Sequence, residues 1–80
     1  MKFSITITLK KDVLDPQGKV VQNTLINLGF ADLKSIRQGK FFEVEINEKN
    51  EDKAENQIKE MCEKLLANMI IEDYKINKLQ

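Results

Sequence analysis

The sequence predicts an α+β fold, in which an antiparallel sheet carries two helices on one face. Three stretches of its 80 residues repeat apolar side chains at every second position, which is the period of a half-buried strand. Two further stretches repeat them at helical spacing. Residues that cap helices or form turns separate these stretches. A chain of this length holds one domain, so we expect residues 1–80 to fold as a single unit.

The first strand is expected over residues 3–9 and is followed by a helix over residues 16–28. In the strand, the odd positions are apolar and the even positions are Ser or Thr. Asp15 can accept hydrogen bonds from the free amides at the helix start. Pro16 suits the first helical position, because its fixed φ fits a helix and an N–H there would have no partner. Both residues therefore mark the start of this helix.

The end of this helix is marked by Gly29. A residue without a Cβ readily adopts the left-handed conformation that terminates many helices. Phe30 would then fold back toward Leu25, as in a Schellman motif. The helix is therefore expected to end at about residue 28.

The middle of the chain contains two strand-like stretches, residues 33–37 and residues 40–46. Together they exceed the five or six residues of a typical strand. Gly39 lies between them and is compatible with either a hairpin turn or a bulge in one long bent strand. The sequence leaves these two alternatives open.

A second helix is expected over residues 54–69, and a last strand over residues 70–76. The helix has the apolar stripe of an amphipathic helix, formed by Ala54, Ile58, Met61, Cys62, Leu65 and Met69. Because Cys62 lies on this stripe and no histidine is present to lower its pKa, we expect it in the core and not at a reactive site.

The element order is therefore β-α-β(β)-α-β, which resembles the ferredoxin-like class. Such a two-layer fold leaves one sheet face open, and Phe41 has the parity that places it on that face. Charge is also uneven, because residues 1–40 carry seven basic and three acidic residues, whereas residues 41–80 carry six basic and ten acidic ones. Both features favour docking to another copy or to another protein.

Composition excludes several classes of function. Basic and acidic residues number 13 each, so the formal charge is zero and gives no reason to expect nucleic acid or a membrane as partner. The chain has no histidine and one cysteine, so we expect no catalytic residue and no metal site. Because it lacks a long apolar run and allows no intrachain disulfide, we expect a cytoplasmic protein.

Gly39 and Lys40 invite comparison with a phosphate-binding loop. A Walker-type loop needs a glycine five residues before Gly39 and Ser or Thr after the lysine, but this chain has Lys34 and Phe41 there. Arg37 and Lys40 instead suit ion pairs with acidic groups of a partner, or a phosphate held mainly by another subunit. No local feature requires either side chain, so the alternative to such a partner contact is a turn or bulge with solvated Arg37 and Lys40.

Three segments of the chain are distinctive. They are Leu9-Lys10-Lys11-Asp12-Val13-Leu14-Asp15-Pro16-Gln17-Gly18-Lys19-Val20-Val21-Gln22, Leu28-Gly29-Phe30 and Ile36-Arg37-Gln38-Gly39-Lys40-Phe41-Phe42-Glu43-Val44. In these segments, and in the order of its elements and its length, the chain resembles the PurS family, the small subunit of phosphoribosylformylglycinamidine (FGAM) synthase. The resemblance covers nearly the whole chain, although the second helix matches only in pattern.

The resemblance implies an assembly role in de novo purine biosynthesis. A large PurL subunit would bind ATP with Mg and formylglycinamide ribonucleotide, and a PurQ glutaminase would release ammonia. PurS, as a homodimer or tetramer, would join the two and would bind no cofactor itself. Free ammonia in neutral water is mostly ammonium, which is not nucleophilic, so a sealed contact between the two active sites preserves the reactive species.

Seven positions match the family's motifs and are candidates for contact with these partners: Asp15, Pro16, Gln17, Gly18, Arg37, Gly39 and Lys40. Capping and backbone geometry already account for Asp15, Pro16 and Gly18, so a structural role is favoured for these three. For Arg37 and Lys40 we favour an interface.

A ferredoxin-like fold also permits a second class of function. The alternative is a homodimeric regulatory domain that binds a small molecule at its dimer interface. Such a sensor would bind an amino acid or a nucleotide without any other protein. The sequence shows no convergent set of polar residues that favours this alternative.

Overall fold

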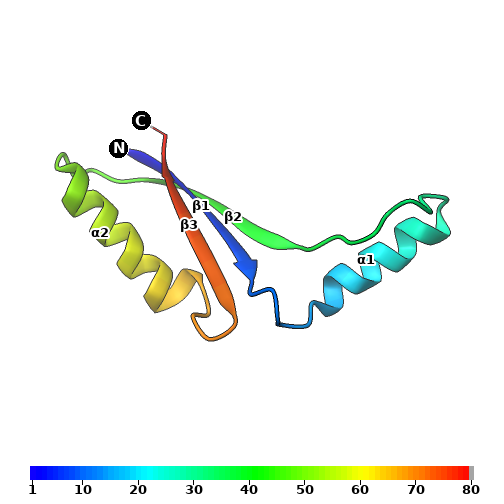
Figure 1. Ribbon diagram of the computed structural model, residues 1–80. Coiled ribbons are helices and arrows are strands. Elements are labelled where there is room, and N and C mark those ends of the chain that lie inside the picture. The colour runs from blue at the N-terminus through cyan, green and yellow to red at the C-terminus, as the bar shows by residue number, and fades with distance from the viewer. Residues whose placement is uncertain (80) are drawn as a thin grey trace.

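The computed structural model describes residues 1–79 and contains a three-stranded sheet, one helix packed on that sheet and one helix that projects from it (Figure 1). The elements in chain order are β1 (Lys2–Leu9), α1 (Pro16–Asn27), β2 (Gly39–Glu45), α2 (Glu51–Met61), a π-helix η1 (Cys62–Leu66) and β3 (Glu72–Lys78). The predicted α+β class and the ferredoxin-like arrangement of an antiparallel sheet with two helices are confirmed.

The strand β1 is the centre of the sheet, and β2 and β3 pair with it on either side. Both pairings are antiparallel. Thr8 at one end of β1 lies opposite Gly39, while Ile5 in its middle lies opposite Ile76 of β3. The strand predicted from alternating apolar and polar residues is therefore the central strand of the sheet, and its apolar face can be completely buried.

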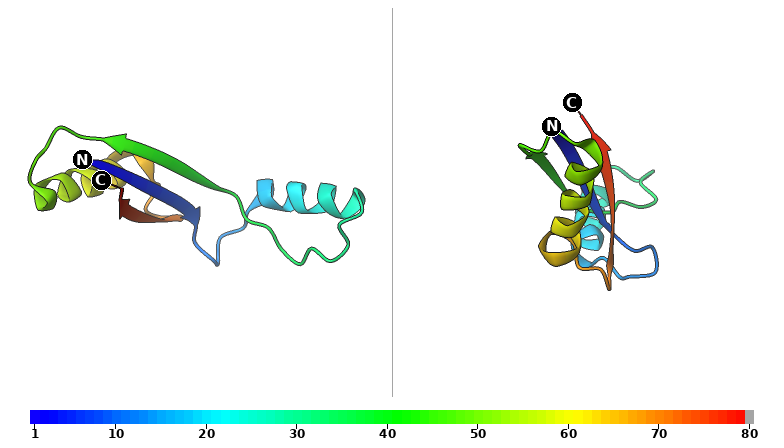
Figure 2. Two further views of the ribbon diagram at one scale, coloured as in Figure 1. Left: turned by 90° about the horizontal axis from the view of Figure 1, so that it is seen from above. Right: turned by 90° about the vertical axis from the view of Figure 1, so that its left-hand side faces the viewer.

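The hydrophobic core lies between α2 and one face of the sheet (Figure 2). Its buried members are the apolar residues of β1 and the apolar stripe of the second helical region, namely Phe3, Ile5, Ile7, Ala54, Ile58, Cys62 and Ala67. Half-buried side chains from the two outer strands pack around this cluster. The placement of Cys62 in the core is confirmed, and its side chain is 0% exposed.

The position of α1 differs from the prediction that both helices cover the sheet. Residues 10–38, here called the arm, leave the end of the sheet, form α1 and return beside it (Figures 1 and 2). Within the arm the side chain of Gln22 donates to the carbonyl of Lys34 at 3.1 Å, so the helix is held by its own return segment. The Cα radius of gyration is 16.1 Å, against about 12 Å for a compact chain of this length.

The termini of α1 follow the sequence prediction closely. The carboxylate of Asp15 accepts from the Gly18 amide, and Pro16 occupies the first turn. At the other end Gly29 has a φ of 111°, and the amide of Phe30 donates to the carbonyl of Leu25 at 3.1 Å. This hydrogen bond, together with the one from Gly29 to Ile26, is the Schellman motif.

The prediction of a strand over residues 33–37 is wrong. These residues form no strand, because β1 ends at Leu9 and the register places Gly39 opposite Thr8. Chain that precedes Gly39 therefore runs past the end of the central strand, where no partner strand is available. Gly39 is neither a hairpin turn nor a bulge, since it is the first paired residue of β2.

The second helical region also ends earlier than residue 69. The α-helix stops at Met61, and the chain continues as a π-helix in which the Ala67 amide donates to the Cys62 carbonyl at 2.9 Å. The π-helix ends at Leu66, because Ala67 has an extended backbone. Beyond it the Asn68 amide donates to the side chain of Glu72, and the Asn68 side chain accepts from the Ile70 amide. Met69, expected on the apolar stripe, lies in the following turn and is 42% exposed.

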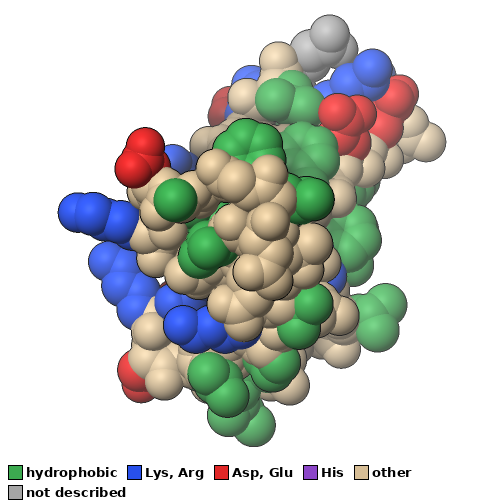
Figure 3. Space-filling model, turned by 90° about the vertical axis from the view of Figure 1, so that its right-hand side faces the viewer, with side chains coloured by type: hydrophobic (Ala, Val, Ile, Leu, Met, Phe, Trp, Pro, Cys, Tyr) green, Lys and Arg blue, Asp and Glu red, His purple; other side chains and the backbone are tan. Residues whose placement is uncertain are grey.

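The arm and the second sheet face expose apolar side chains. Phe41 lies on the face opposite the core, as its parity predicts, and is 62% exposed. The large apolar residues of the arm that are more than one-third exposed are Leu14, Val20, Val21, Ile26, Leu28 and Phe30. Hydrophobic side chains accordingly reach the surface in several places on the side of the molecule that carries α1 (Figure 3).

Candidate partner interface at the root of the arm

The two motifs singled out in the sequence meet at the root of the arm, which we define as residues 9–15 and 37–40. The carboxylate of Asp15 accepts from the Gln38 amide at 3.1 Å, across a separation of 23 residues. A cleft of about 250 Å³ lies at this point and is lined by residues of both motifs and of the neighbouring strands, namely Leu9, Asp15, Gln17, Gln38, Gly39, Lys40 and Glu72. Residues distant in sequence therefore form one surface.

Asp15 uses both of its carboxylate oxygens. Oδ1 accepts from the amide of Gly18 at 2.9 Å, which caps α1, and Oδ2 accepts from the amide of Gln38. These hydrogen bonds favour the charged form and lower the pKa of Asp15 below its ordinary value of 3.8, with a smaller contribution from the positive charge of Arg37. The side chain thus ties the start of α1 to the segment that returns to the sheet.

Arg37 has internal partners that the sequence did not reveal. One guanidinium nitrogen donates to the carbonyl of Lys10 at 2.9 Å and the other to that of Lys11 at 3.2 Å, and longer hydrogen bonds reach Leu9 and Val13. The Leu9 carbonyl is at the end of β1, and the other three belong to the turn that leads from β1 into the arm. The side chain therefore has a structural role, contrary to the expectation that no local feature requires it, while its contact with a partner stays a prediction.

Lys40 is also engaged within the chain. Its ammonium group donates to the carbonyl of Leu66 at 3.1 Å and lies 3.4 Å from the carboxylate of Glu72. That carboxylate accepts from the Asn68 amide as well, so Lys40 supports the end of the π-helix. Glu72 could not be predicted as a partner of Lys40, because no local pattern connects it with a lysine 32 residues away.

Two glycines of the motifs are required by close approach. A Cβ on Gly18 would lie 2.3 Å from a carboxylate oxygen of Asp15 and 3.0 Å from the Ile36 carbonyl oxygen. A Cβ on Gly39 would lie 2.6 Å from the carbonyl oxygen of Ile7 in the adjacent strand. From the sequence, backbone conformation was the expected reason for glycine at these positions. In the structure the reason is instead the lack of room for a Cβ atom.

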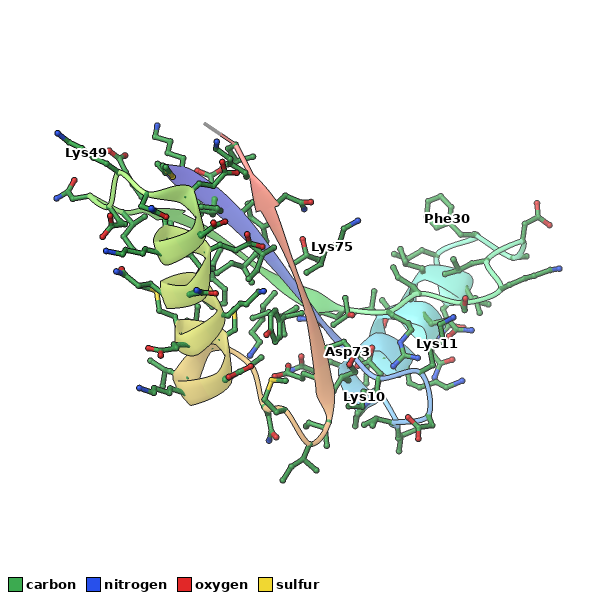
Figure 4. The ribbon with its side chains drawn as sticks, turned by 60° about the vertical axis from the view of Figure 1, so that its left-hand side comes forward. Lys10, Lys11, Phe30, Lys49, Asp73 and Lys75 are labelled. Atoms are coloured by element: carbon green, nitrogen blue, oxygen red, sulfur yellow. The ribbon has the colours of Figure 1, made fainter. Side chains whose placement is uncertain are left out.

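The remaining two candidates face outward. Pro16 and Gln17 are exposed in the first turn of α1, and Gln17 lines the cleft at the root. Lys10 and Asp73 lie beside this region, where their side chains form a 2.7 Å ion pair between the root and β3 (Figure 4). A polar, partly basic surface therefore surrounds the place where the arm leaves the sheet.

The described residues offer little that could perform chemistry. Burial raises the pKa of the Cys62 thiol, and the neighbouring Glu63 adds to this effect, so the thiolate is disfavoured. In residues 1–79 no three side chains of the His, Cys, Asp and Glu types are grouped as a metal site would require. No helix in that part of the chain has the length and hydropathy to cross a bilayer.

Residues 2–80 match the family model described as PurS, phosphoribosylformylglycinamidine (FGAM) synthase. Among curated proteins, the PurS subunit of this synthase from Bacillus subtilis is 45% identical over 74 residues, which cover 92% of this chain and 87% of that protein. The PurS subunit from Methanocaldococcus jannaschii is 41% identical over 75 residues, which cover 94% of this chain and 90% of that protein.

Solved structures agree with this fold over nearly its full length. Bacillus subtilis PurS superposes with a TM-score of 0.86 at 43% identity and covers 95% of this chain and 94% of its own. A chain of the structure of PurLQS from Thermotoga maritima superposes with a TM-score of 0.89 at 32% identity, and the match covers 98% of this chain and 95% of that one. The chain belongs to the PurS family, the PurS subunits of FGAM synthase.

Proposed function

We propose that this chain is the non-catalytic assembly subunit of an FGAM synthase and joins a PurQ-type glutaminase to a PurL-type synthetase. One observation carries the proposal: a chain of the same fold, 32% identical to this one, was solved within PurLQS of Thermotoga maritima. In this proposal ATP and Mg bind to the large subunit, the complex is cytoplasmic, and residues 1–80 act as a single PurS-like domain. The family relationship also favours assembly over the alternative of a small-molecule sensor.

The shape of the chain supports a role that depends on other proteins. Its accessible surface is 6194 Å², against about 5,000 Å² for a compact monomer of 9.3 kDa. The excess of about 1,200 Å² is larger than the ~800 Å² that each partner buries in an interface of standard size. A projecting arm with uncovered apolar side chains gains stability when another surface covers it.

We propose a second copy of this chain as the occupant of the apolar surface of the arm. The arm exposes Leu28 and Phe30 by 70% and 60%, and a core of seven buried apolar side chains leaves an isolated chain only modestly stable. A homodimer or tetramer would cover these residues without using the root. The root of the arm, with Gln17, Gly39 and Lys40 at its cleft, would remain available to the two larger subunits.

Reconstitution tests the assembly role. The PurL-type and PurQ-type proteins of the same organism are mixed with and without this chain, and FGAM formation is followed with glutamine or with ammonium as nitrogen source. We expect glutamine-driven synthesis only when the chain is present, whereas ammonium-driven synthesis by the large subunit proceeds without it. Equal glutamine-driven rates in both mixtures would disprove the proposal.

A further inference from the structure

We infer that Asp15 and Arg37 are positioning residues that fix the direction of the arm relative to the sheet. The arm packs on itself and not on the sheet, so within a single chain its orientation is decided where it is attached (Figures 1 and 2). Two segments cross this attachment, residues 9–15 on the way out and residues 37–40 on the way back. Residues 10–15 and 37–38 lie outside the strands, and without further attachment these two stretches would form a hinge.

The two side chains connect these segments in opposite directions. The guanidinium group of Arg37, on the returning segment, donates to backbone carbonyls of the turn in the outgoing segment. This turn is itself stabilised by a 3.0 Å hydrogen bond from the Val13 amide to the Lys10 carbonyl. Asp15 reaches from the outgoing segment to the amide of Gln38, the residue next to Arg37. Attachments that run both ways restrict rotation of the arm as well as separation of the two segments.

The chemistry of both side chains suits this task. A guanidinium group presents five N–H donors in a planar fork, so a single Arg37 can satisfy several converging carbonyls, whereas a lysine offers one compact ammonium. A carboxylate has two acceptor oxygens, and Asp15 uses one for Gly18 and the other for Gln38. An asparagine there would keep the helix cap but would present an N–H₂ group where the second acceptor is needed.

Arm direction is measurable by pulsed electron paramagnetic resonance. Spin labels are attached to cysteines introduced by Asn23→Cys in α1 and Asn56→Cys in α2, both at exposed positions, while native Cys62 stays unlabelled because it is buried. An excess of unlabelled chain suppresses distances between copies. The unmodified root should give one narrow distance distribution. Arg37→Met should broaden it, and Lys34→Met, an exposed position of the same segment, should not.

Folding is checked separately, so that loss of the arm contacts is not confused with unfolding. Circular dichroism and the protection of Cys62 from a thiol reagent report on the sheet and α2. If Arg37→Met fails to fold, Arg37→Lys and Asp15→Asn are measured instead, because each removes only part of the attachment. A folded variant with a distribution as narrow as that of the original chain would overturn the inference.

The last step of the inference rests on the proposed function and concerns assembly. If loosening reduces the correctly directed arm to a tenth of the population, about tenfold more chain is needed for half-maximal glutamine-driven synthesis. The ammonium-driven rate, which in the proposed function does not require this chain, should be unchanged. If the distance distribution broadens but the same concentration of chain still gives half-maximal synthesis, the link between arm direction and assembly is overturned. If the original chain does not support glutamine-driven synthesis at all, the proposed function is rejected, while the distance measurement still tests the role of Asp15 and Arg37.

Discussion

The carboxylate of Asp15 and the backbone amide of Gln38 form a 3.1 Å hydrogen bond that joins the start of α1 to the entrance of β2. The same carboxylate caps the helix through Gly18. One side chain therefore serves local structure and tertiary structure at once. This double use connects the helix-start motif with the second motif, some twenty residues later in the chain.

The charge of Asp15 is expected to make stability depend on acid. Because its hydrogen bonds lower the folded-state pKa below 3.8, the carboxylate stabilises the fold above that pH, and this contribution is lost as pH falls through the folded-state pKa. Asp15→Asn should therefore reduce the free energy of unfolding most at neutral pH, and the deficit should shrink in acid. Urea unfolding at a series of pH values measures it.

The matched control for this prediction is Asp32→Asn, at an exposed position of the same arm. It should change the free energy of unfolding little at any pH. A deficit of Asp15→Asn that is the same at neutral and acid pH would show that the charge of Asp15 is not responsible.

Gly29→Ala should destabilise the fold through backbone strain alone. Its φ of 111° is unfavourable for a residue with a Cβ, although the space around it is open. The cost of left-handed backbone is about 1–2 kcal/mol, which lowers the Tm of a domain this small by about 4–8 °C per kcal/mol. Gly29→Asn should lose less, because asparagine tolerates this region better. Equal Tm values for the glycine and alanine forms would contradict this explanation.

Gly39→Ala should destabilise the fold for a different reason. Its Cβ would meet the Ile7 carbonyl oxygen at 2.6 Å, so β1 and β2 must move apart where they begin to pair. Overpacking of this kind costs about 1–3 kcal/mol. Gly39→Asn should be at least as destabilising as Gly39→Ala, because any Cβ atom meets the same carbonyl oxygen. At position 29, in contrast, asparagine should be less destabilising than alanine. Thermal unfolding of the alanine and asparagine forms at both positions distinguishes the two mechanisms.

The thiol of Cys62 should be protected in the native state. The residue is fully buried and burial raises its pKa, so both access and ionisation oppose reaction. If labelling requires opening of the core, a free energy of opening of ~3 kcal/mol slows it on the order of 100-fold relative to the chain in urea. Rapid labelling by a thiol reagent in native buffer would place Cys62 outside a stable core.

The apolar surface of the arm should govern self-association. Leu28→Asp places a charge where the proposed second copy would pack, so sedimentation equilibrium should report a lower mass than for the original chain. Asn23→Asp adds the same charge at an exposed polar position of α1 and serves as the control. An unchanged mass for Leu28→Asp, with the control also unchanged, would exclude this surface from the interface between copies.

Features that depend on near neighbours could be predicted from the sequence. Periodicity identified the central strand and its buried face, because successive side chains of a strand point to opposite sides whatever its partners are. The termini of α1 were equally readable, since Asp15, Pro16 and Gly29 act on backbone groups within a few residues. The core position of Cys62 followed from its place on the apolar stripe.

The location of α1 and the contacts of the candidate residues could not be predicted, because they depend on how distant segments come together. The register of β2 against β1 ends the ladder at Thr8 and Gly39, which leaves the preceding residues unpaired and carries the helix beyond the sheet. Arg37 and Lys40 look free in the sequence, since their partners are backbone carbonyls and a glutamate more than twenty residues away. Contacts of this kind depend on which segments the fold brings together, and local spacing carries no record of that.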